Sequence, residues 1–375
     1  MAKGLPDNIH LQVCEFSDLT GWPADRHDEA FAAFLSSARR MLESPYKTRA
    51  LGIDSHALCK VAGAAVDLAK DGLPDAATAK AFFQTHFKPH HIIVDGSKAG
   101  FLTGFYEPVV EASPVQTTEF SVPLYRRPDD LVDVDDDNRP STMDPYFRFG
   151  RNANGQIEEH FTRSQVQQGA LEGQGLELVW LRNKVEAFFI HVQGSAKLQL
   201  PDGTAMRVTY AAKSGHPYTS VAKVLCARHQ IDPASMTADR LAQWMHSHPD
   251  ELDDLLAHND SYIYFKPITG LDPHAGPIAA AKVPLIAGRS MAVDRLLHTF
   301  GSPIWLETSQ PLPEDSTPLA RLMIAHDTGS AIVGANRGDY FAGSGDDAGR
   351  IGGRIRHEAR MTVLVPNAVM MGGSS

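Results

Sequence analysis

Cysteine is scarce in this chain, since its 375 residues include only Cys14, Cys59 and Cys226. Three scattered cysteines are too few for a disulfide framework or a thiolate zinc site, so we expect buried or partly buried thiols. Long apolar runs are missing too: no stretch of about 18 apolar residues occurs, which excludes a membrane-spanning helix. Repeats with a period of roughly 20 to 50 residues are also absent, which argues against a solenoid or a propeller.

Positive charge is in short supply. The chain carries 35 lysines and arginines against 45 aspartates and glutamates, and its formal net charge is -10. A general basic surface, of the kind that binds nucleic acid or anionic lipid, is therefore not expected. We predict no nucleic acid partner.

The most acidic stretch, DDLVDVDDDNRP (129–140), spaces its aspartates as a calcium-binding loop does. That loop needs a glycine where Asn138 stands and a glutamate where Asp144 stands. We therefore predict a solvated acidic loop and no metal site here.

What is present is a globular composition, with 43% hydrophobic residues that can fill a sizeable core. Apolar residues at helical spacing predict helices in the first hundred residues, and from Ile92 short apolar runs between turn residues predict a barrel or a sandwich. The predicted helices occupy 25–42, 56–70, 74–87, 218–229 and 237–259. The predicted strands occupy 100–110, 122–128, 176–183, 185–195, 197–210, 262–267, 282–294, 303–308, 319–327 and 361–366.

Two carboxylates stand out near the C-terminus, in the stretch LARLMIAHDTGSAIVGANRGDYFAGSG (319–345). Asp327 and Asp339 lie at the ends of apolar runs, and the residues between them are small. A polar residue that ends an apolar strand lies at the rim of its sheet, where flanking glycines let a substrate approach closely. The alternative is structural, with Asp327 capping the turn at Thr328–Gly329 and Asp339 beginning a strand. The residues alone leave both interpretations open.

Two glycine-containing motifs are weaker candidates. Gly194–Ser195 lacks the second glycine and the following helix of a serine nucleophile elbow. The glycine-rich stretch 343–353 is not followed by the helix pattern that a phosphate-binding loop needs. We predict a flexible loop at 343–353.

Five sequence blocks, taken together, go further than any single residue. In chain order they are TGFYEPV (103–109), FFIHVQGSAKLQLPDGTAMRVTYAAKSGHPYTSVAKVL (188–225), YFKP (264–267), GRSMAVDR (288–295) and HDTGSAIVGANRGDYFAGSG (326–345). This set resembles the membrane-bound lytic transglycosylase A family of peptidoglycan-cleaving enzymes, in that family's order and spacing over about residues 100–360.

The resemblance implies a mainly β fold with peripheral helices. A double-psi β-barrel domain would be built from 1–107 and 268–375, with N-terminal helices, and a smaller β-barrel-like domain would be inserted at 108–267. A groove between the domains would hold a glycan strand of peptidoglycan, which is the expected partner. No metal or other cofactor is implied, and the sequence does not indicate an oligomeric state.

The same match implies roles for individual residues. Asp339 would be the general acid and base, Asp327 would support it nearby, and Asp294 would be a structural or subsite residue. The other residues expected to contact substrate are Thr103, Tyr106, Gln193, Gly194, Ser195 and Tyr340.

The activity implied is non-hydrolytic cleavage of the β-1,4 bond between N-acetylmuramic acid and N-acetylglucosamine. Asp339, kept protonated by its surroundings, would protonate the leaving oxygen and then take the proton of the muramoyl C6 hydroxyl, which yields a 1,6-anhydro sugar. Two alternatives stay open. One is a water-using inverting glycoside hydrolase with Asp327 or Asp294 as base, and the other is a glycan-binding protein without catalysis.

The expected location follows from the substrate. The starting residues, MAKGLPDNIHLQ, contain neither the apolar run of a signal peptide nor a cysteine for lipid attachment. Peptidoglycan as substrate nevertheless implies a periplasmic protein that can associate with the outer membrane.

Overall fold

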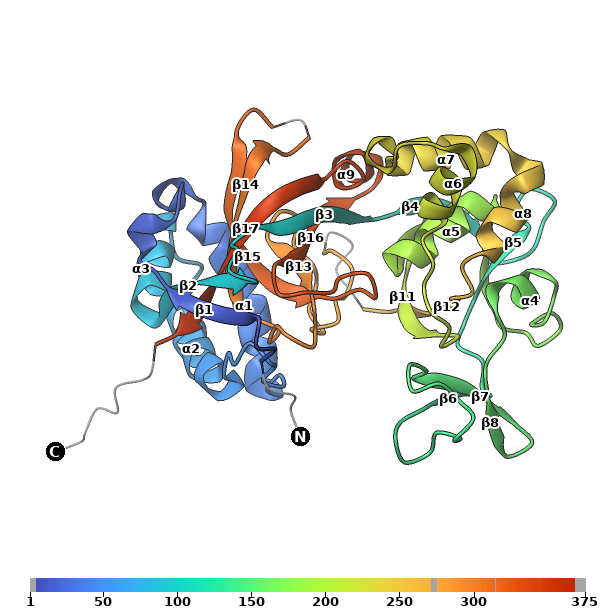
Figure 1. Cartoon of the computed structure of the whole chain (residues 1–375), viewed down its shortest axis with the longest axis horizontal. Helices are drawn as coiled ribbons and strands as arrows, with labels where there is room; N and C mark the ends of the chain where they lie inside the picture. The colour runs from blue at the N-terminus through green and yellow to red at the C-terminus, as the bar shows by residue number, and fades with distance from the viewer. Residues whose placement is uncertain (1–4, 271–274, 314, 368–375) are drawn as a thin grey trace. The chain divides into compact units, whose positions relative to one another are not determined.

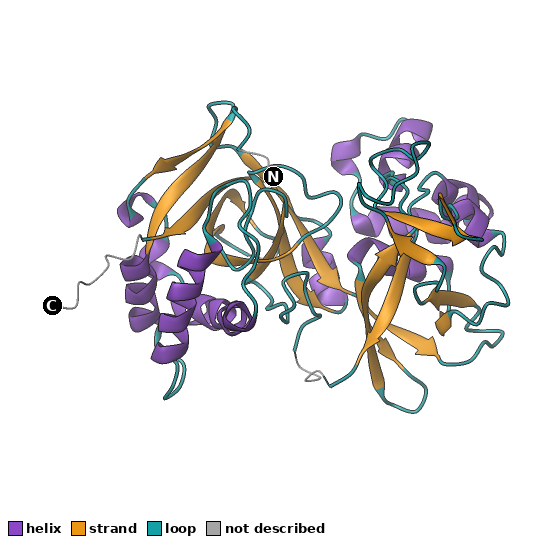
Figure 2. Ribbon diagram, turned by 90° about the horizontal axis from the view of Figure 1, so that it is seen from below, coloured by secondary structure: helices purple, strands orange, loops and turns teal. Residues whose placement is uncertain are grey.

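The computed structural model describes residues 5–270, 275–313 and 315–367. The chain divides into two compact units, here called unit 1 (1–106, 278–343 and 347–375) and unit 2 (107–277 and 344–346). Each is mainly β, with helices at its periphery (Figures 1 and 2). The mainly β class with peripheral helices that the sequence predicts is confirmed.

Unit 1 is built on an eight-stranded sheet in the order β1-β2-β17-β14-β15-β13-β16-β3. β17 also pairs with β3, so the strands from β17 to β3 follow one another around a ring and make the sheet barrel-like. Strands far apart in sequence lie side by side, as β2 and β17 do in Figure 1. The strands of unit 1 are β1 (Ile9–Val13), β2 (Phe87–Val94), β3 (Gly100–Glu107), β13 (Ser290–Val293), β14 (Pro303–Pro311), β15 (Pro318–Asp327), β16 (Arg337–Ser344) and β17 (Arg356–Pro366).

Three long helices share the core of unit 1. Asp54 and Asp75 cap two of them, because their carboxylates accept hydrogen bonds from backbone amides of the first turn at 2.7 and 2.8 Å. Phe31 and Phe34 of the first helix meet Phe83 of the third edge to face. The helices are α1 (His27–Glu43), α2 (Ser55–Leu68) and α3 (Ala76–His86), which confirms the N-terminal helices that the sequence predicts.

The glycine-rich stretch 343–353 is not the flexible loop that the sequence predicts. It contains the short helix α9 (Asp346–Gly352). Gly352 packs so closely on β3 that a Cβ atom at Gly104 would lie 2.7 Å from its carbonyl oxygen. Tertiary packing thus favours a helix where the weak helix propensity of glycine argues against one.

Unit 2 contains a six-stranded sheet in the order β12-β11-β10-β4-β9-β5 and a three-stranded sheet in the order β6-β7-β8. Its strands are β4 (Val109–Ser113), β5 (Val122–Tyr125), β6 (Leu131–Asp133), β7 (Phe149–Ala153), β8 (Gln156–Glu158), β9 (Glu177–Leu181), β10 (Ser195–Gln199), β11 (Ala205–Lys213) and β12 (Ile263–Ile268). Its helices are α4 (Arg163–Gln167), α5 (Lys184–Gln193), α6 (Val221–His229), α7 (Ala238–Ser247) and α8 (Pro249–Ala257).

The strand predicted at 185–195 is wrong, because helix α5 occupies most of this stretch. The Asn183 side chain accepts a hydrogen bond from the amide of Glu186 at 3.0 Å, and Gly194 ends the helix with a φ of 76°. Phe188 packs into one apolar cluster and Ile190 into another. A helix buried on two sides has a nearly continuous apolar run, which periodicity alone does not distinguish from a buried strand.

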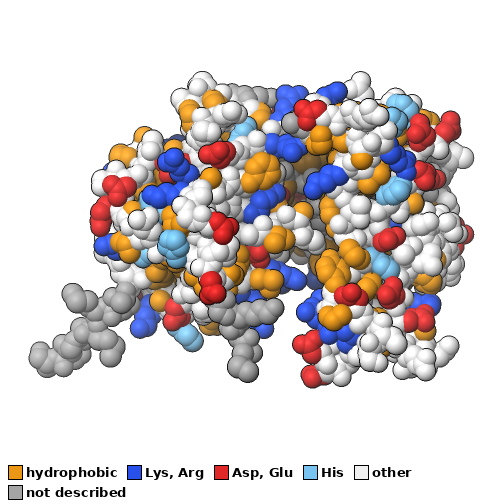
Figure 3. All heavy atoms as spheres, viewed as in Figure 1, with side chains coloured by type: hydrophobic (Ala, Val, Ile, Leu, Met, Phe, Trp, Pro, Cys, Tyr) orange, Lys and Arg blue, Asp and Glu red, His pale blue; other side chains and the backbone are white. Residues whose placement is uncertain are grey.

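The acidic stretch 129–140 is the predicted solvated loop only in part. Residues 135–138 are exposed, but Leu131–Asp133 form β6, and Leu131 and Val134 are buried. Asp135 accepts hydrogen bonds from the amides of Asp137 and Asn138, and Asp136 pairs with Arg139 at 2.7 Å. On the face drawn in Figure 3, acidic and basic side chains are interspersed. Within the described residues, no helix combines the length and apolarity needed to cross a bilayer.

Candidate active site

Asp327 and Asp339 lie on two strands that flank the same third strand. Asp339 of β16 is the antiparallel partner of Ala292 on β13, and Asp327 at the end of β15 is its parallel partner on the other side. Adjacent strands lie about 4.8 Å apart, so the two Cα atoms are separated by roughly 10 Å. The register of the β13–β15 pair shifts between Met291 and Ala292, next to this pairing. The two carboxylates are close enough to interact, because the charge of Asp327 raises the pKa of Asp339.

Side chains hold the carboxylate of Asp339. The Thr103 hydroxyl of β3 donates a hydrogen bond to its Oδ1 atom. Arg337, two residues before Asp339 on the same strand, donates from Nη2 to the Thr103 hydroxyl oxygen at 2.6 Å. Burial raises the pKa of Asp339 to about 6; the Thr103 hydrogen bond and the Arg337 charge oppose this rise, and the Asp327 charge adds to it.

Backbone groups hold the carboxylate of Asp327. Its Oδ1 atom accepts a hydrogen bond from the amide of Ala280 at 3.0 Å. The amide of Ala281 donates to the carbonyl of His326 at 2.9 Å, which fastens the same loop to the end of β15. Burial raises the pKa of Asp327 to about 6, opposed by the amides of Ala280 and Thr328 and by the charge of Lys282.

This arrangement can perform proton transfer. A carboxyl group with a pKa of about 6 is protonated in part of the population near neutral pH, so it can donate a proton and, once ionised, accept one. Both carboxyls have a raised pKa, and the charge of Asp327 contributes to the rise at Asp339. Raised pKa values of this kind are typical of functional sites. Asp339 is the third residue of β16, so it does not begin the strand.

Asp294 makes structural contacts. It is 7% exposed and follows the last residue of β13. Its Oδ1 atom accepts from the amide of Leu296 and its Oδ2 atom from the amide of Gly334, both at 2.9 Å. Gly334 belongs to the connection between Asp327 and Asp339, so Asp294 fixes the loop that joins the two carboxylate strands.

The two predicted tyrosines of unit 1 differ in exposure. The ring of Tyr106 is half-buried and lies against α9, where a Cβ atom at Gly349 would be 3.0 Å from it. Tyr340 is 6% exposed, and its hydroxyl accepts a hydrogen bond from Arg321 at 2.9 Å. Because Tyr340 is adjacent to Asp339 on a strand, its side chain points to the opposite face. Substrate contacts by either tyrosine stay a prediction.

The remaining predicted residues form one turn of unit 2. Gln193 ends α5, Gly194 adopts the left-handed conformation and Ser195 begins β10. The carbonyl of Gly194 accepts a hydrogen bond from the amide of Tyr210 at 2.8 Å, and Ser195 is 9% exposed. Their contact with a sugar also stays a prediction.

Sequence reasoning missed Arg337, Ala292 and Ala280. A signal existed for Arg337, since residues two apart on a strand project to the same face, and Arg337 precedes Asp339 by two positions in RGD. Ala292 and Ala280 carried no such signal. An alanine and a backbone amide become important only through the strand register and the loop that the fold creates.

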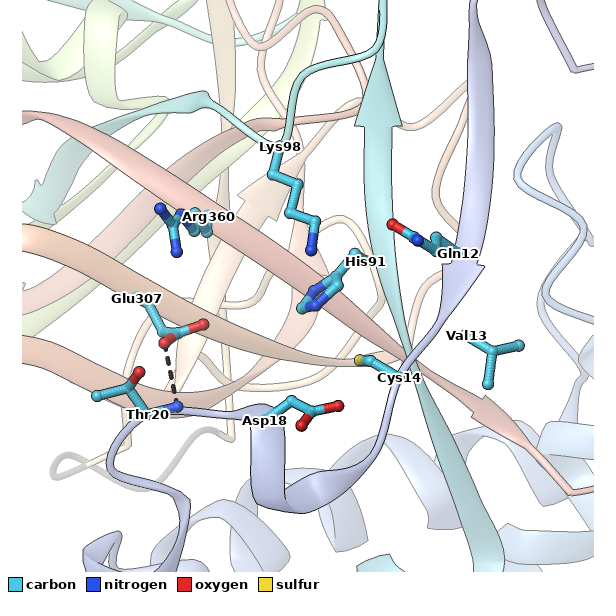
Figure 4. Close-up of a pocket in the computed structure, with 9 residues that line it drawn as sticks. All are labelled: Gln12, Val13, Cys14, Asp18, Thr20, His91, Lys98, Glu307 and Arg360. Atoms are coloured by element: carbon cyan, nitrogen blue, oxygen red, sulfur yellow. Dashed lines mark hydrogen bonds between the residues drawn. The ribbon is translucent and has the colours of Figure 1, made fainter.

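Unit 1 also contains a pocket away from the two carboxylates. The pocket has a volume of about 340 Å³ and shares no residue with the carboxylate pair. In Figure 4, Lys98 and Arg360 lie on one side of His91, and Asp18 and Glu307 lie on the other. The full lining is Gln12, Val13, Cys14, Asp18, Thr20, His91, Lys98, Glu307 and Arg360. Among the residues that the structure describes, no group of three or more histidines, cysteines, aspartates and glutamates could hold a metal ion.

Two protein-family models match the chain. The one described as the MltA specific insert domain matches residues 101–266, and the one described as the 3D domain matches residues 289–365. Asp294, Asp327 and Asp339 all fall within the second match.

Individual relatives agree with these matches. Membrane-bound lytic murein transglycosylase A of Vibrio cholerae is 30% identical over 278 residues, which cover 72% of this chain and 67% of the relative. The protein of the same name from Escherichia coli K12 is 30% identical over 269 residues, 70% of this chain but 64% of the relative, just under two thirds of its length. The crystal structure of a membrane-bound lytic murein transglycosylase from Agrobacterium tumefaciens is 42% identical, with a TM-score of 0.87 over 95% of this chain and 97% of that one.

The chain therefore belongs to the membrane-bound lytic murein transglycosylase A family. This confirms the family that the five sequence blocks indicate.

Proposed function

We propose that this protein is a lytic transglycosylase that cleaves the β-1,4 bond between N-acetylmuramic acid and N-acetylglucosamine in peptidoglycan. The observation that supports this most directly is the environment of Asp339. Burial raises the pKa of its carboxyl group to about 6. The Thr103 hydroxyl donates a hydrogen bond that orients this group. The names of the relatives point to the same substrate.

In the first step Asp339 acts as a general acid. Its proton passes to the glycosidic oxygen as the bond between that oxygen and the anomeric carbon breaks. The sugar ring then carries oxocarbenium character, and Asp339 is left as a carboxylate. A raised pKa serves this step, because the group must be protonated when the substrate binds.

In the second step the same residue acts as a general base. The muramoyl C6 hydroxyl attacks the anomeric carbon of its own ring, and its proton passes to Asp339. A 1,6-anhydro ring forms, no water is consumed and the acid is regenerated. Because the nucleophile belongs to the substrate, the attack has a high effective molarity and a single carboxyl group suffices.

Asp327 assists through its charge. Its negative charge raises the pKa of Asp339, which favours the protonated form that the first step needs. In this proposal Asp327 neither donates nor accepts the transferred proton. Asp294 has a structural role, since its carboxylate oxygens bind backbone amides.

We extend the proposal to architecture and location. The ring of strands in unit 1 is compatible with a double-psi barrel, and we propose that barrel for this unit. We also propose the boundaries 1–107 and 268–375 for the catalytic domain and 108–267 for the inserted one. A periplasmic location is proposed because peptidoglycan lies in that compartment.

Mass spectrometry of muropeptides tests the function. Purified peptidoglycan is digested with the native protein and with Asp339→Asn. Asp67→Asn is the matched control, because Asp67 of α2 is exposed and forms an ion pair with the exposed Lys70. We expect anhydro ends, lighter by one water than reducing ends, from the native protein and the control. Asp339→Asn should release no product but should still co-sediment with insoluble peptidoglycan, which shows that it binds.

Two other results would point elsewhere. Ordinary reducing ends would indicate a water-using hydrolase, with Asp327 or Asp294 as base. Binding without any product from the native protein would indicate a glycan-binding protein.

A further inference from the structure

The Arg337 guanidinium is fixed by three contacts. Nη2 donates to the Thr103 hydroxyl oxygen at 2.6 Å, and Nη1 donates to the carbonyl of Gly338. The guanidinium also lies over the ring of Phe101, 5.4 Å from its centroid. The side chain is half-buried, so it is held in place and is not a freely moving surface cation.

These contacts determine which hydrogen bond the Thr103 hydroxyl accepts and which one it donates. A guanidinium has donors only, so the hydroxyl oxygen must accept from Arg337. The hydroxyl has a single hydrogen, and it is donated to Oδ1 of Asp339. Arg337, Thr103 and Asp339 therefore form a chain of hydrogen bonds that all point toward the carboxylate.

We propose that Arg337 is a positioning residue that acts on Asp339 through the Thr103 hydroxyl and confines the acidic proton of Asp339 to Oδ2. Because Oδ1 accepts the hydrogen bond from Thr103, a proton on that oxygen would make it a poorer acceptor and weaken this bond. The proton then lies on the oxygen that is not bonded to Thr103. This inference rests on the proposed function, since it concerns the group that protonates the leaving oxygen.

The charged groups that act on Asp339 come from two strands. Arg337, on the same strand, lowers the pKa of Asp339, and Asp327, on β15, raises it. Lys282 acts on Asp327 and lowers the pKa of that carboxyl. Thr103 lowers the pKa of Asp339 through its hydrogen bond. Loss of either Arg337 or Thr103 should therefore raise the pKa of Asp339.

A double-mutant cycle tests whether Arg337 works through Thr103. The variants are Arg337→Met, Thr103→Val and the double variant, with Arg337→Lys as the conservative replacement. Arg40→Met is the matched control, because Arg40 is also half-buried but donates to the carbonyl of Ser44 at the end of α1. Thermal denaturation checks that each variant folds.

Two readouts are measured on each variant. One is the pH profile of anhydro-product release. The other is the pKa of Asp339, followed by the ¹³C shift of its carboxyl carbon and assigned by comparison with Asp339→Asn. The second readout does not depend on turnover.

We expect Arg337→Met to lower kcat roughly tenfold, the factor that corresponds to one hydrogen bond. The pKa of Asp339 should rise, and the loss of activity on the alkaline side should move to higher pH. The double variant should lose no more kcat than Thr103→Val alone, because both changes break the same chain. Arg337→Lys should restore part of the loss, and Arg40→Met should match the native protein.

Other results would overturn the inference. If the losses of the two single variants multiply in the double variant, Arg337 acts independently of Thr103. If Arg337→Met lowers kcat equally at every pH without moving the pKa of Asp339, its role is structural. A raised pKa in both single variants together with reducing ends from the native protein would support the hydrogen-bond chain while rejecting the transglycosylase function.

Discussion

Asp327 and Asp339 are paired through Ala292, the residue that lies opposite both of them on β13. Burial raises the pKa of each carboxyl to about 6, and the charge of Asp327 adds to the rise at Asp339. The two are held differently, Asp339 by the Thr103 side chain and Asp327 by a backbone amide. In the proposed mechanism Asp339 is the group that exchanges protons, and Asp327 acts on it through its charge.

The first prediction concerns the pH dependence of cleavage. Because the general acid must be protonated, cleavage should decrease as pH rises through about 6, the raised pKa of Asp339. Asp327→Asn removes a negative charge that raises this pKa, so the decrease should move to lower pH. Rates of anhydro-product release between pH 4.5 and 8 would measure both profiles. An unchanged profile in Asp327→Asn would show that the two carboxyls do not interact.

The second prediction concerns stability. Both pKa values lie above the ordinary value of 3.8, so folding favours the protonated forms, and the stability from this preference is lost as pH rises from about 4 to 6. Asp327→Asn and Asp339→Asn should therefore raise Tm at pH 7.5 and change it little at pH 4. Calorimetry at the two pH values measures this difference. Asp67→Asn, whose carboxylate is exposed, should leave Tm within error at both.

The sequence predicted what depends on local pattern. The helices capped by Asp54 and Asp75 and the short strands between turn residues are predicted correctly, because their signals lie within a few residues. Helix α5 was not predicted, because burial on two sides removes the apolar periodicity that distinguishes a helix from a strand. Helix α9 was not predicted, because close packing on β3 stabilises it and its own composition does not.

The candidate site was predicted in part. The two aspartates could be selected because they end apolar runs, and family resemblance assigned their roles. Both pair with Ala292 only because of the strand order. In that order β13 lies between β15 and β16, although it precedes both in sequence. Such a register has no local signal, so the sequence could not place Thr103 against Asp339.

The third prediction concerns the buried ion pair that joins the start of α1 to the barrel-like sheet. Arg289 makes two bonds of 2.9 Å to Asp25, and the two side chains are only 3% and 4% exposed. Asp25→Ala would leave a buried guanidinium without this partner, so we expect the free energy of unfolding to decrease by about 3–5 kcal/mol. Glu29 also contacts Arg289 but is 48% exposed, so Glu29→Gln should cost at most about 1 kcal/mol. Urea denaturation would compare the two, and equal losses would contradict the burial argument.

The fourth prediction separates structure from chemistry at Asp294. Asp294→Ala leaves the amides of Leu296 and Gly334 without their acceptors, so we expect a loss of about 1–3 kcal/mol in the free energy of unfolding. Asp294→Asn keeps one carbonyl acceptor and should lose less. Cleavage by either variant should decrease moderately, because the loop between Asp327 and Asp339 loosens, while the pH at which activity falls stays at the native value.

Urea denaturation and the pH profile of product release together decide this case. If Asp294 has a structural role, its variants have a lower free energy of unfolding and an unchanged pH profile. If Asp294→Asn instead kept native stability and lost cleavage altogether, Asp294 would be acting as a base on water. The released ends would then be reducing sugars in the native protein, and the single-carboxyl mechanism would have to be given up for the hydrolytic one.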